Sequence, residues 1–567
     1  MNEELARIEE RLGRLEQMVD ALNRRLQAIE TGAAPVPDSE GSREAGASSS
    51  AAASADAEVS DRSALLSLAG RTFIVFGGAF LLRALTSSGQ LHRGVGIVLG
   101  LVYAAVWLAA ADRAAGSGRR LSGVFHGIAC VVIGFPLLWE ASTRFGFFTP
   151  ATSAVMLAVF TGLALVVARR RGLQMLAGPA LLGALVTTVG LVGVTGQFIP
   201  FTVMLILLGA ATMSLGYDHD WYWLGWLPAL VVDVVLAGLT IVALRTESIQ
   251  RPLVILVTQL FLVATYVGSV AVRTLVRRRV VTAFEVIQTL GALAVGLGGA
   301  IAVAHASGVG EAAIGVGSMI LGGAGYIAAF AYCPAAALRR NFHFYAVLGF
   351  VLVLTGCGVL LRGSTLAVAV AGLAVLTAWL GYRLSESALT LQSAAYGTIA
   401  AGASGLLWVG VSAFVVTPIA NSGMLELSPL IALAATAICI AIPPVREGSA
   451  TAVRLSRAVL ALLMVVGSGG AVVASVAPAI VGVPAVAGIL ATLRTAVLAA
   501  AAVLLACARR SKRTVDLAWL LYPVLCIGGF KLLFEDFRYS EPAMLFVALG
   551  LFGAALVVTA RLVKRGT

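Results

Sequence analysis

The sequence predicts an all-α fold, a polytopic transmembrane helical bundle of about eighteen spans with a short N-terminal cytoplasmic coiled coil. From residue 62 to residue 567, apolar stretches of about twenty residues follow one another, separated by short loops that carry arginine. A helix of that length crosses the hydrocarbon core, and lipid requires each backbone amide to be paired within its own segment. Charged residues form only 12% of the chain, hydrophobic residues 59%, and the mean hydropathy is +0.95.

Residues 1–30 form a heptad segment whose two core positions alternate at spacings of three and four. These positions hold Leu5, Leu12, Val19 and Leu26, and Ile8, Leu15, Leu22 and Ile29. Four heptads predict a short coiled coil that forms a homo-oligomer or binds a protein partner. A single amphipathic helix on the bilayer is the alternative, but such a helix favours a basic polar face, and this face is mixed and acidic.

Residues 31–61 are dominated by Ala, Ser, Gly, Glu and Pro. This low-complexity composition predicts a disordered tether between the heptads and the multi-spanning transmembrane domain, residues 62–567. We place the eighteen spans at residues 62–84, 94–112, 121–140, 149–168, 173–194, 199–215, 221–244, 252–272, 281–304, 311–332, 341–361, 364–382, 389–415, 427–443, 455–476, 483–507, 514–533 and 542–560.

The basic residues support an even number of spans with both termini in the cytoplasm. With that topology, 24 Lys and Arg residues fall on the inside and 7 on the outside, as the positive-inside rule expects. Residues 1–61 are acidic, with 6 Arg against 13 Asp and Glu, so the overall charge of +12 comes from the membrane domain. We therefore expect the lipid bilayer, and no nucleic acid, as the partner of these basic residues.

Motifs that would carry chemistry are missing. The sequence contains no P-loop, HExxH or GxSxG pattern, and its six cysteines show no CxxC spacing. The run Asp218, His219 and Asp220 precedes an interfacial group of tryptophans and cannot easily point at one metal. We predict no cofactor, no metal site and no catalytic residue, and an enzyme is not the favoured function class.

Among the ionisable residues inside predicted spans, four are the main candidates: Arg71, Asp233, Glu285 and Arg494. A charge in hydrocarbon is costly unless it is paired or hydrated, so each is a functional candidate. Arg494 could pair with Asp233 or Glu285 to lock helices together, or these groups could line a path for transport or protons.

A second set of candidates lies on the predicted outer face. Its main members are Glu140 and Arg144 after the third span and Lys531 and Asp536 after the seventeenth; Glu311, Glu426, Glu535 and Arg538 lie on the same face. Paired carboxylates there could perform acid–base chemistry, but connecting loops commonly contain such residues.

Three segments carry a resemblance to a known family. They are Phe80 to Arg83 with Leu91, Arg93, Gly96 and Gly100; Trp221 to Leu224; and Lys531 and Asp536 in KLLFED, followed by Leu549 and Gly550. In these segments the chain resembles the bacterial predicted membrane proteins of domain-of-unknown-function family 2339. The chain departs from the family pattern at two places. The family usually has a lysine at the position of Arg83, and it tends to have a glycine and a proline where this chain has Thr187 and Thr188. The resemblance implies a multi-pass protein of the bacterial inner membrane and brings no established activity.

Three function hypotheses follow. The first is transport or a flippase-like role in the bacterial envelope, with Asp233, Glu285 and Arg494 along a path between helices. The second is a non-enzymatic assembly or scaffold protein that recruits a partner through its coiled coil. The third is an intramembrane enzyme on lipid-linked envelope substrates, with Glu140, Lys531 and Asp536 as acid and base groups.

Overall fold

The computed structural model describes residues 70, 75, 77–78, 80–81, 83–86, 88, 90–219, 221–245, 249, 251–333, 338–415, 427–445, 450–480, 486–508 and 515–564. The heptad segment, the tether and Arg71 lie outside these described residues. The side chains of Asp218 and His219, and all of Asp220, lie outside them as well. The contacts divide the chain into two compact units, Met1–Gly134 and Phe135–Thr567.

No strand occurs among the described residues, which agrees with the all-α prediction. The α-helices and their bounds are α3 (Arg93–Gly116), α4 (Arg120–Thr143), α5 (Pro150–Arg171), α6 (Gln174–Thr195), α7 (Phe198–His219), α8 (Trp226–Arg245), α9 (Pro252–Ala271), α10 (Ala283–Ala292), α11 (Gly298–Ser307), α12 (Glu311–Ile327), α13 (Arg339–Leu360), α14 (Gly363–Leu384), α15 (Ser387–Ala403), α16 (Leu406–Val415), α17 (Leu427–Ala441), α18 (Ala450–Ile480), α19 (Val486–Ala508), α20 (Leu521–Lys531), α21 (Phe537–Tyr539) and α22 (Pro542–Lys564).

Short segments of other helical types interrupt or extend these helices. Two are 3-10 helices and four are π-helices: η1 (Tyr222–Gly225), η2 (Val272–Val276), η3 (Leu293–Leu297), η4 (Ala328–Tyr332), η6 (Val515–Leu520) and η7 (Leu532–Asp536). The π type is rare and is frequent at functional sites, because its i→i+5 hydrogen bonds displace side chains from the α-helical register.

Within the described residues, fourteen helices are long and apolar enough to cross a membrane. They correspond to fourteen of the predicted spans. Residues 62–84 are largely outside the described part, and residues 389–415 form α15 and α16, a pair bent by 73°. Residues 427–443 correspond to α17, a helix of 15 residues, and residues 514–533 to η6, α20 and part of η7. The total of eighteen stays a prediction.

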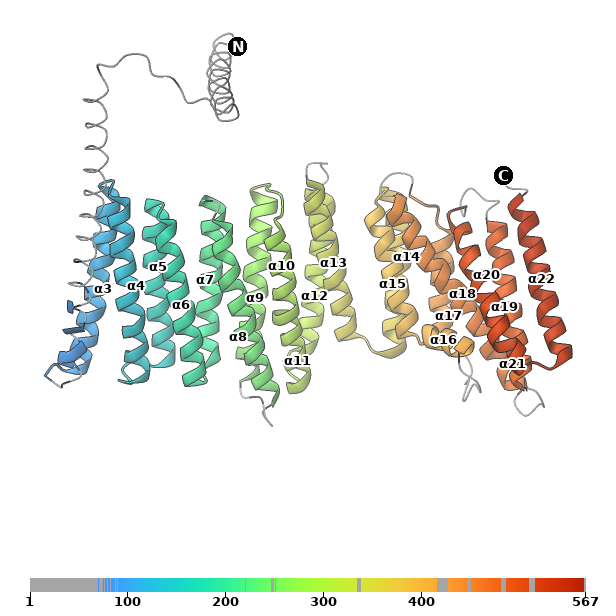
Figure 1. Cartoon of the computed structure of the whole chain (residues 1–567), viewed down its shortest axis with the longest axis horizontal. Helices are drawn as coiled ribbons and strands as arrows, with labels where there is room; N and C mark the ends of the chain where they lie inside the picture. Colours follow the sequence, from blue (N-terminus) through green and yellow to red (C-terminus); the bar gives the residue numbers. More distant parts are fainter. Residues whose placement is uncertain are drawn as a thin grey trace, which may run out of the picture. The chain divides into compact units, whose positions relative to one another are not determined.

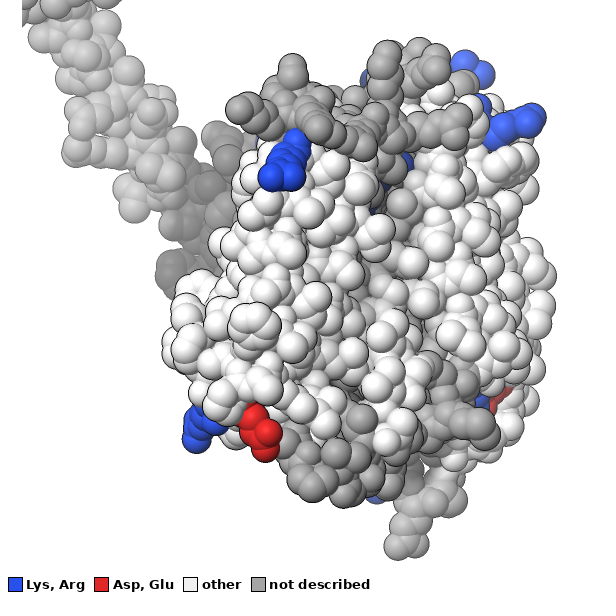
Figure 2. Space-filling view, turned by 90° about the vertical axis from the view of Figure 1, so that its right-hand side faces the viewer, with Lys and Arg blue, Asp and Glu red and all other residues white. Residues whose placement is uncertain are grey.

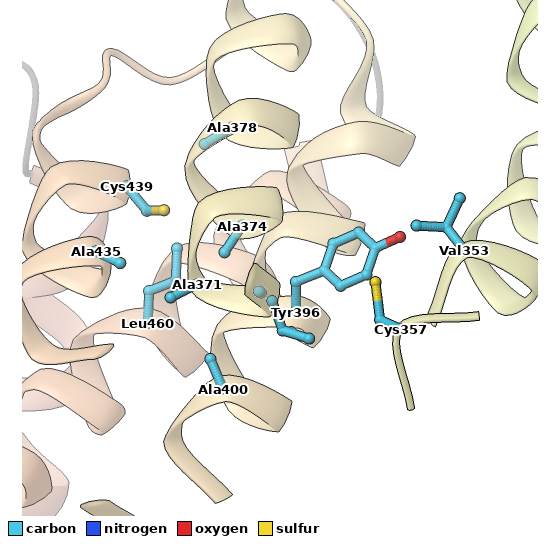
Figure 3. Packing of buried hydrophobic residues seen from close by; sticks show 12 residues of the cluster. Val353, Cys357, Ala371, Ala374, Ala378, Tyr396, Ala400, Ala435, Cys439 and Leu460 are labelled. Atoms are coloured by element: carbon cyan, nitrogen blue, oxygen red, sulfur yellow. The ribbon is translucent and has the colours of Figure 1, made fainter. Parts of the chain in front are cut away.

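Most successive helices of the second unit stand side by side and alternate in direction, whereas α10 continues through η3 into α11 as one span (Figure 1). Small residues allow close approach, most clearly between α12 and α13, where a Cβ atom added to Gly325 would lie 3.2 Å from the Gly349 Cα atom. In the core of α13, α14, α15, α17 and α18, alanines surround Tyr396, whose ring points toward Val353 and Cys357 (Figure 3). Backbones can approach this closely because alanine and glycine fill the interface.

The outer surface of these helices is apolar. Phe530, Phe534 and Phe546 are each more than 60% exposed. One face of the molecule is a broad band without charge, and its charged residues are confined to the two ends of the band (Figure 2). Water would make so large an apolar surface unfavourable, whereas lipid matches it. The protein is therefore an integral membrane protein whose helices contact lipid.

Candidate functional site

Five charged side chains are buried in the described part of the chain: Arg273, Glu285, Arg457, Arg494 and Asp536. Apart from Arg457, which donates a hydrogen bond to the Ile442 carbonyl, they belong to two separate groups. One group lies where α19 meets the end of α20, and the other lies at the start of α10. Asp233, half-buried in α8, is close to the second group.

The first group is a charge cluster made of Arg494, Lys531, Glu535 and Asp536. Arg494 is 1% exposed and forms an ion pair with Glu535. Lys531 Nζ lies 2.6 Å from Asp536 Oδ2 and 3.7 Å from Glu535 Oε2. Two positive and two negative charges therefore neutralise one another, which lowers the cost of removing them from water.

Thr495 of α19 links the positive and negative members of the charge cluster. Its hydroxyl accepts a hydrogen bond from Lys531 Nζ at 2.7 Å and donates one to Asp536 Oδ2 at 2.9 Å. Lys531 also donates to the Ala491 carbonyl. Asp536 Oδ1 and the hydroxyl of Ser540, both buried, have no hydrogen-bond partner among the described residues. The cluster is thus paired in charge but keeps hydrogen-bonding capacity beside Asp536.

The π-helix η7 explains how Lys531 and Asp536 meet. Residues five apart in an α-helix point about 140° apart around the axis, so only i,i+3 and i,i+4 pairs face one another. In a π turn, the i→i+5 hydrogen bond places residues five apart nearly above one another. Because η7 occupies Leu532–Asp536, the Lys531 ammonium reaches the Asp536 carboxylate. The KLLFED segment carries the residues, but its hydropathy does not reveal the π turn.

The second half of a broken span ends beside the charge cluster. The helix axis bends by 73° between α15 and α16, where Gly405 adopts a φ of +77° that a residue with a side chain rarely takes. Arg494 Nε donates to the Ala413 carbonyl in the last turn of α16 at 2.5 Å. The guanidinium therefore donates a hydrogen bond to a carbonyl at the C-terminal end of α16, which is the negative end of the helix dipole. Figure 1 shows α16 and α21 at the same end of these helices.

Glu285 is the centre of the second group, at the start of α10. It is fully buried, and its Oε2 atom lies 2.5 Å from Arg273 Nη1. Its Oε1 atom accepts a hydrogen bond from the Tyr217 hydroxyl at 3.0 Å. Thr282 and Glu285 form a capping box in which each side chain bonds the other residue's backbone N–H. The geometry therefore assigns Glu285 to a helix cap and an ion pair.

Asp233 lies one helical turn deeper, beside Gln288 of α10. Gln288 Nε2 lies 3.4 Å from Asp233 Oδ1 and 3.3 Å from Oδ2. In the structure Arg494 pairs with Glu535, and Glu285 pairs with Arg273. The predicted pairing of Arg494 with Asp233 or Glu285 is therefore replaced by two other pairs, and Asp233 contacts an amide.

The outer-face candidates separate into two places. Lys531 and Asp536 belong to the charge cluster, whereas Glu140 lies near the end of α4 and Arg144 lies just beyond it. Arg144 is exposed, and its guanidinium lies 6.0 Å from the centre of the Phe145 ring. The described hydrogen bonds of the Asp536 side chain come from Thr495 and Lys531. Among the described residues, no group of three or more His, Cys, Asp or Glu could hold a metal ion.

Sequence reasoning did not single out Arg273, Thr495 or Gln288 as site residues. Arg273 directly follows the predicted span 252–272, where a basic residue is expected at the inner membrane surface. The T-x-x-E pattern of Thr282 and Glu285, in contrast, is a recognisable helix-start signal. No comparable signal marks Thr495, because a threonine in an apolar helix commonly bonds its own backbone. No protein-family model, curated protein or solved structure matches this chain.

Proposed function

We propose that the protein is a membrane transport protein, with a flippase-like role as one form of it, and that the charge cluster is its site for a charged solute or lipid headgroup. One observation carries the proposal: four charged side chains converge inside an apolar helix bundle at the end of a broken span. Transporters typically place ion and substrate sites where discontinuous helices end beside buried charge.

The energetic cost of burying these charges favours a functional role of the charge cluster over a purely structural one. A single Arg, Lys or Asp at the centre of a membrane helix costs about 3 kcal/mol or more, and close apolar packing would hold α19 against α20 and α22 without that cost. Asp536 Oδ1 and the Ser540 hydroxyl can accept or donate further hydrogen bonds. A charged ligand could therefore exchange with one arm of an ion pair while the cluster stays close to neutral.

The proposal includes the cellular setting that the sequence favours. The arginine distribution supports an orientation with both termini in the cytoplasm, and the resemblance to domain-of-unknown-function family 2339 implies the bacterial inner membrane. The heptads of residues 1–30 support self-association or a protein partner next to the membrane. An assembly protein recruited through these heptads is the competing function, and it predicts a charge cluster that water never reaches.

Cysteine accessibility of Thr495→Cys tests the proposal. A membrane-impermeant thiol reagent is added to vesicles of either orientation, and peptide mass spectrometry reads each site, so the six native cysteines can remain. Glu541→Cys, at an exposed position, is the positive control. Thr188→Cys is the matched buried control, because Thr188 is fully buried and bonds the Ala184 carbonyl of its own helix.

We expect Thr495→Cys to react from at least one side, and Thr188→Cys to react from neither. Proteoliposomes carrying a fluorescent phospholipid then test the flippase form, because dithionite quenches only the outer leaflet unless lipid crosses. If Thr495→Cys is as unreactive as Thr188→Cys while Glu541→Cys reacts, the charge cluster is a dry structural lock. Transport through it is then wrong, and the assembly function is favoured.

A further inference from the structure

Asp233 differs from the other intramembrane carboxylates. It lies near the middle of the span Trp223–Arg245, and its neighbour Gln288 lies five residues, or about 8 Å at the α-helical rise, inside the span Ala283–Ser307. Glu285, Glu535 and Asp536 each face an arginine or a lysine. Within the described residues, no Lys, Arg or His lies within ion-pair distance of Asp233; the polar group described beside it is the neutral amide of Gln288.

The surroundings of the Asp233 carboxyl form a built site between α8, α9 and α10. A Cβ atom added to Gly291 would lie 2.7 Å from Asp233 Oδ2, so the missing side chain of Gly291 makes room for the carboxyl. The hydroxyl of Tyr266 on α9, a residue only 1% exposed, has no hydrogen-bond partner among the described residues. Gln288 is 6% exposed.

We propose that Asp233 is a proton-binding site within the membrane, with Gln288 as the side chain that accommodates both protonation states. A carboxylate without a cation is costly in a low-dielectric medium and neutralises by taking up a proton. An amide suits that exchange, because its NH₂ group donates to a carboxylate, and rotation presents its carbonyl to a carboxylic acid. An arginine in the place of Gln288 would stabilise only the carboxylate form of Asp233.

The titratable groups on the neighbouring helices are engaged in other interactions, so Asp233 is the group that would bind the proton. On α7, Tyr217 donates to Glu285, and on α10, Glu285 is held by Arg273 of η2. On α9, the hydroxyl of Tyr266 packs against Gly209 of α7. A metal cation would need several oxygen ligands at once, whereas a proton needs one. The use of this proton to drive a solute rests on the proposed function, but proton binding itself does not.

Labelling of the full-length protein in proteoliposomes with dicyclohexylcarbodiimide tests the proposal. This apolar reagent reacts with protonated carboxyl groups inside a bilayer, because the acid proton moves to its nitrogen as the carboxyl oxygen adds to its carbon. Peptide mass spectrometry then compares Asp233 with the cation-paired Glu285 in one sample, and Asp233→Asn identifies the modified residue. The comparison is made across a pH series.

We expect Asp233 to be labelled at least about tenfold more than Glu285 at about pH 6, and its labelling to fall as the pH rises toward about 9. Gln288→Leu removes the hydrogen bond to the carboxylate and should extend labelling to higher pH. Equal labelling of Asp233 and Glu285, or labelling unchanged by pH, would overturn the proposal. Protection by sodium chloride at constant ionic strength would assign the site to sodium instead. None of these readouts depends on water reaching Thr495, so the two proposals fail separately.

Discussion

A double-mutant cycle on Arg494 and Glu535 measures how strongly the charge cluster holds α19 to η7. Glu535→Gln leaves the Arg494 guanidinium buried at 1% exposure without its carboxylate. Removing one partner of a buried pair costs about 3 to 5 kcal/mol, and this site belongs near the upper end. Arg494→Met leaves Glu535, which is 19% exposed and therefore partly hydrated, so we expect about 3 kcal/mol.

The double variant removes both charges and returns the cluster to neutrality. We expect it to cost about 5 kcal/mol, well below the sum of the single variants, which corresponds to a coupling of about 3 kcal/mol. Denaturant titration in mixed micelles gives the free energy of unfolding. Cys357 and Cys439 are buried, at 2% and 5% exposure, so their reactivity with a thiol reagent reports unfolding and no cysteine has to be introduced.

Arg339 and Glu386 form the matched control, a bidentate pair at 3.1 and 3.2 Å whose arginine is 50% exposed. Arg339→Met and Glu386→Gln should each change the free energy of unfolding by no more than about 1 kcal/mol, as surface pairs do. A coupling between Arg494 and Glu535 below about 0.5 kcal/mol would refute the reasoning, because it would mean that the two charges do not depend on each other.

Three further predictions concern the local geometry and use the same titration. Glu285→Gln should cost about 3 kcal/mol because the buried Arg273 guanidinium loses the carboxylate of its ion pair. Thr282→Ala should cost about 1 kcal/mol because the helix cap is lost. Wild-type stability in Glu285→Gln would contradict the ion pair. Gly470→Ala should cost about 2 kcal/mol because its Cβ atom would overlap the Gly410 Cα atom. Gly372→Ala is the control and should be nearly neutral, because the space around Gly372 is open. Equal effects of the two substitutions would contradict the α16–α18 contact. Deletion of Leu533, 61% exposed in η7, should be tolerated because the shortened segment pairs Lys531 and the aspartate at α-helical spacing. Deletion of Ile527, 57% exposed in α20, should rotate the cluster by about 100° and be strongly destabilising; the reverse order would contradict the π turn.

The long helices could be predicted from hydropathy because lipid imposes one simple condition on every span. Fourteen spans satisfy it, and the structure places helices there. The bend within residues 389–415 was not predicted, because the sequence there contains no charged residue and is interpreted as one span. The length is informative, since 27 residues would reach about 40 Å as one helix, more than the hydrocarbon core requires. Its break depends on Gly405 and on close contact between Gly410 of α16 and Gly470 of α18, which is a tertiary property.

The partners of the buried charges could not be predicted, because pairing depends on which helices become neighbours. Arg494 lies 41 residues from Glu535, and Tyr217 lies 68 residues from Glu285. In contrast, the Thr282 capping box is local, and its pattern was present in the sequence. Local hydrogen bonds therefore leave a sequence signature, whereas an ion pair between spans leaves two isolated charges that each look like a functional candidate.

The helical irregularities and the buried charges occur together, which argues that both serve the same sites. The π-helix η2 contains Arg273, and η7 contains Glu535 and Asp536, so two of the four π segments supply members of the two charged groups. A π turn gives up regular i→i−4 hydrogen bonds, and a membrane interior supplies no water to replace them. Such turns persist where another interaction compensates for this loss, and the ion pairs to Glu285 and Lys531 supply it here. Because each turn and its ion pair depend on one another, a ligand that competes for a carboxylate would also favour a change of helical register. Under the proposed transport function, binding at the charge cluster would therefore be linked to the helical register of η7.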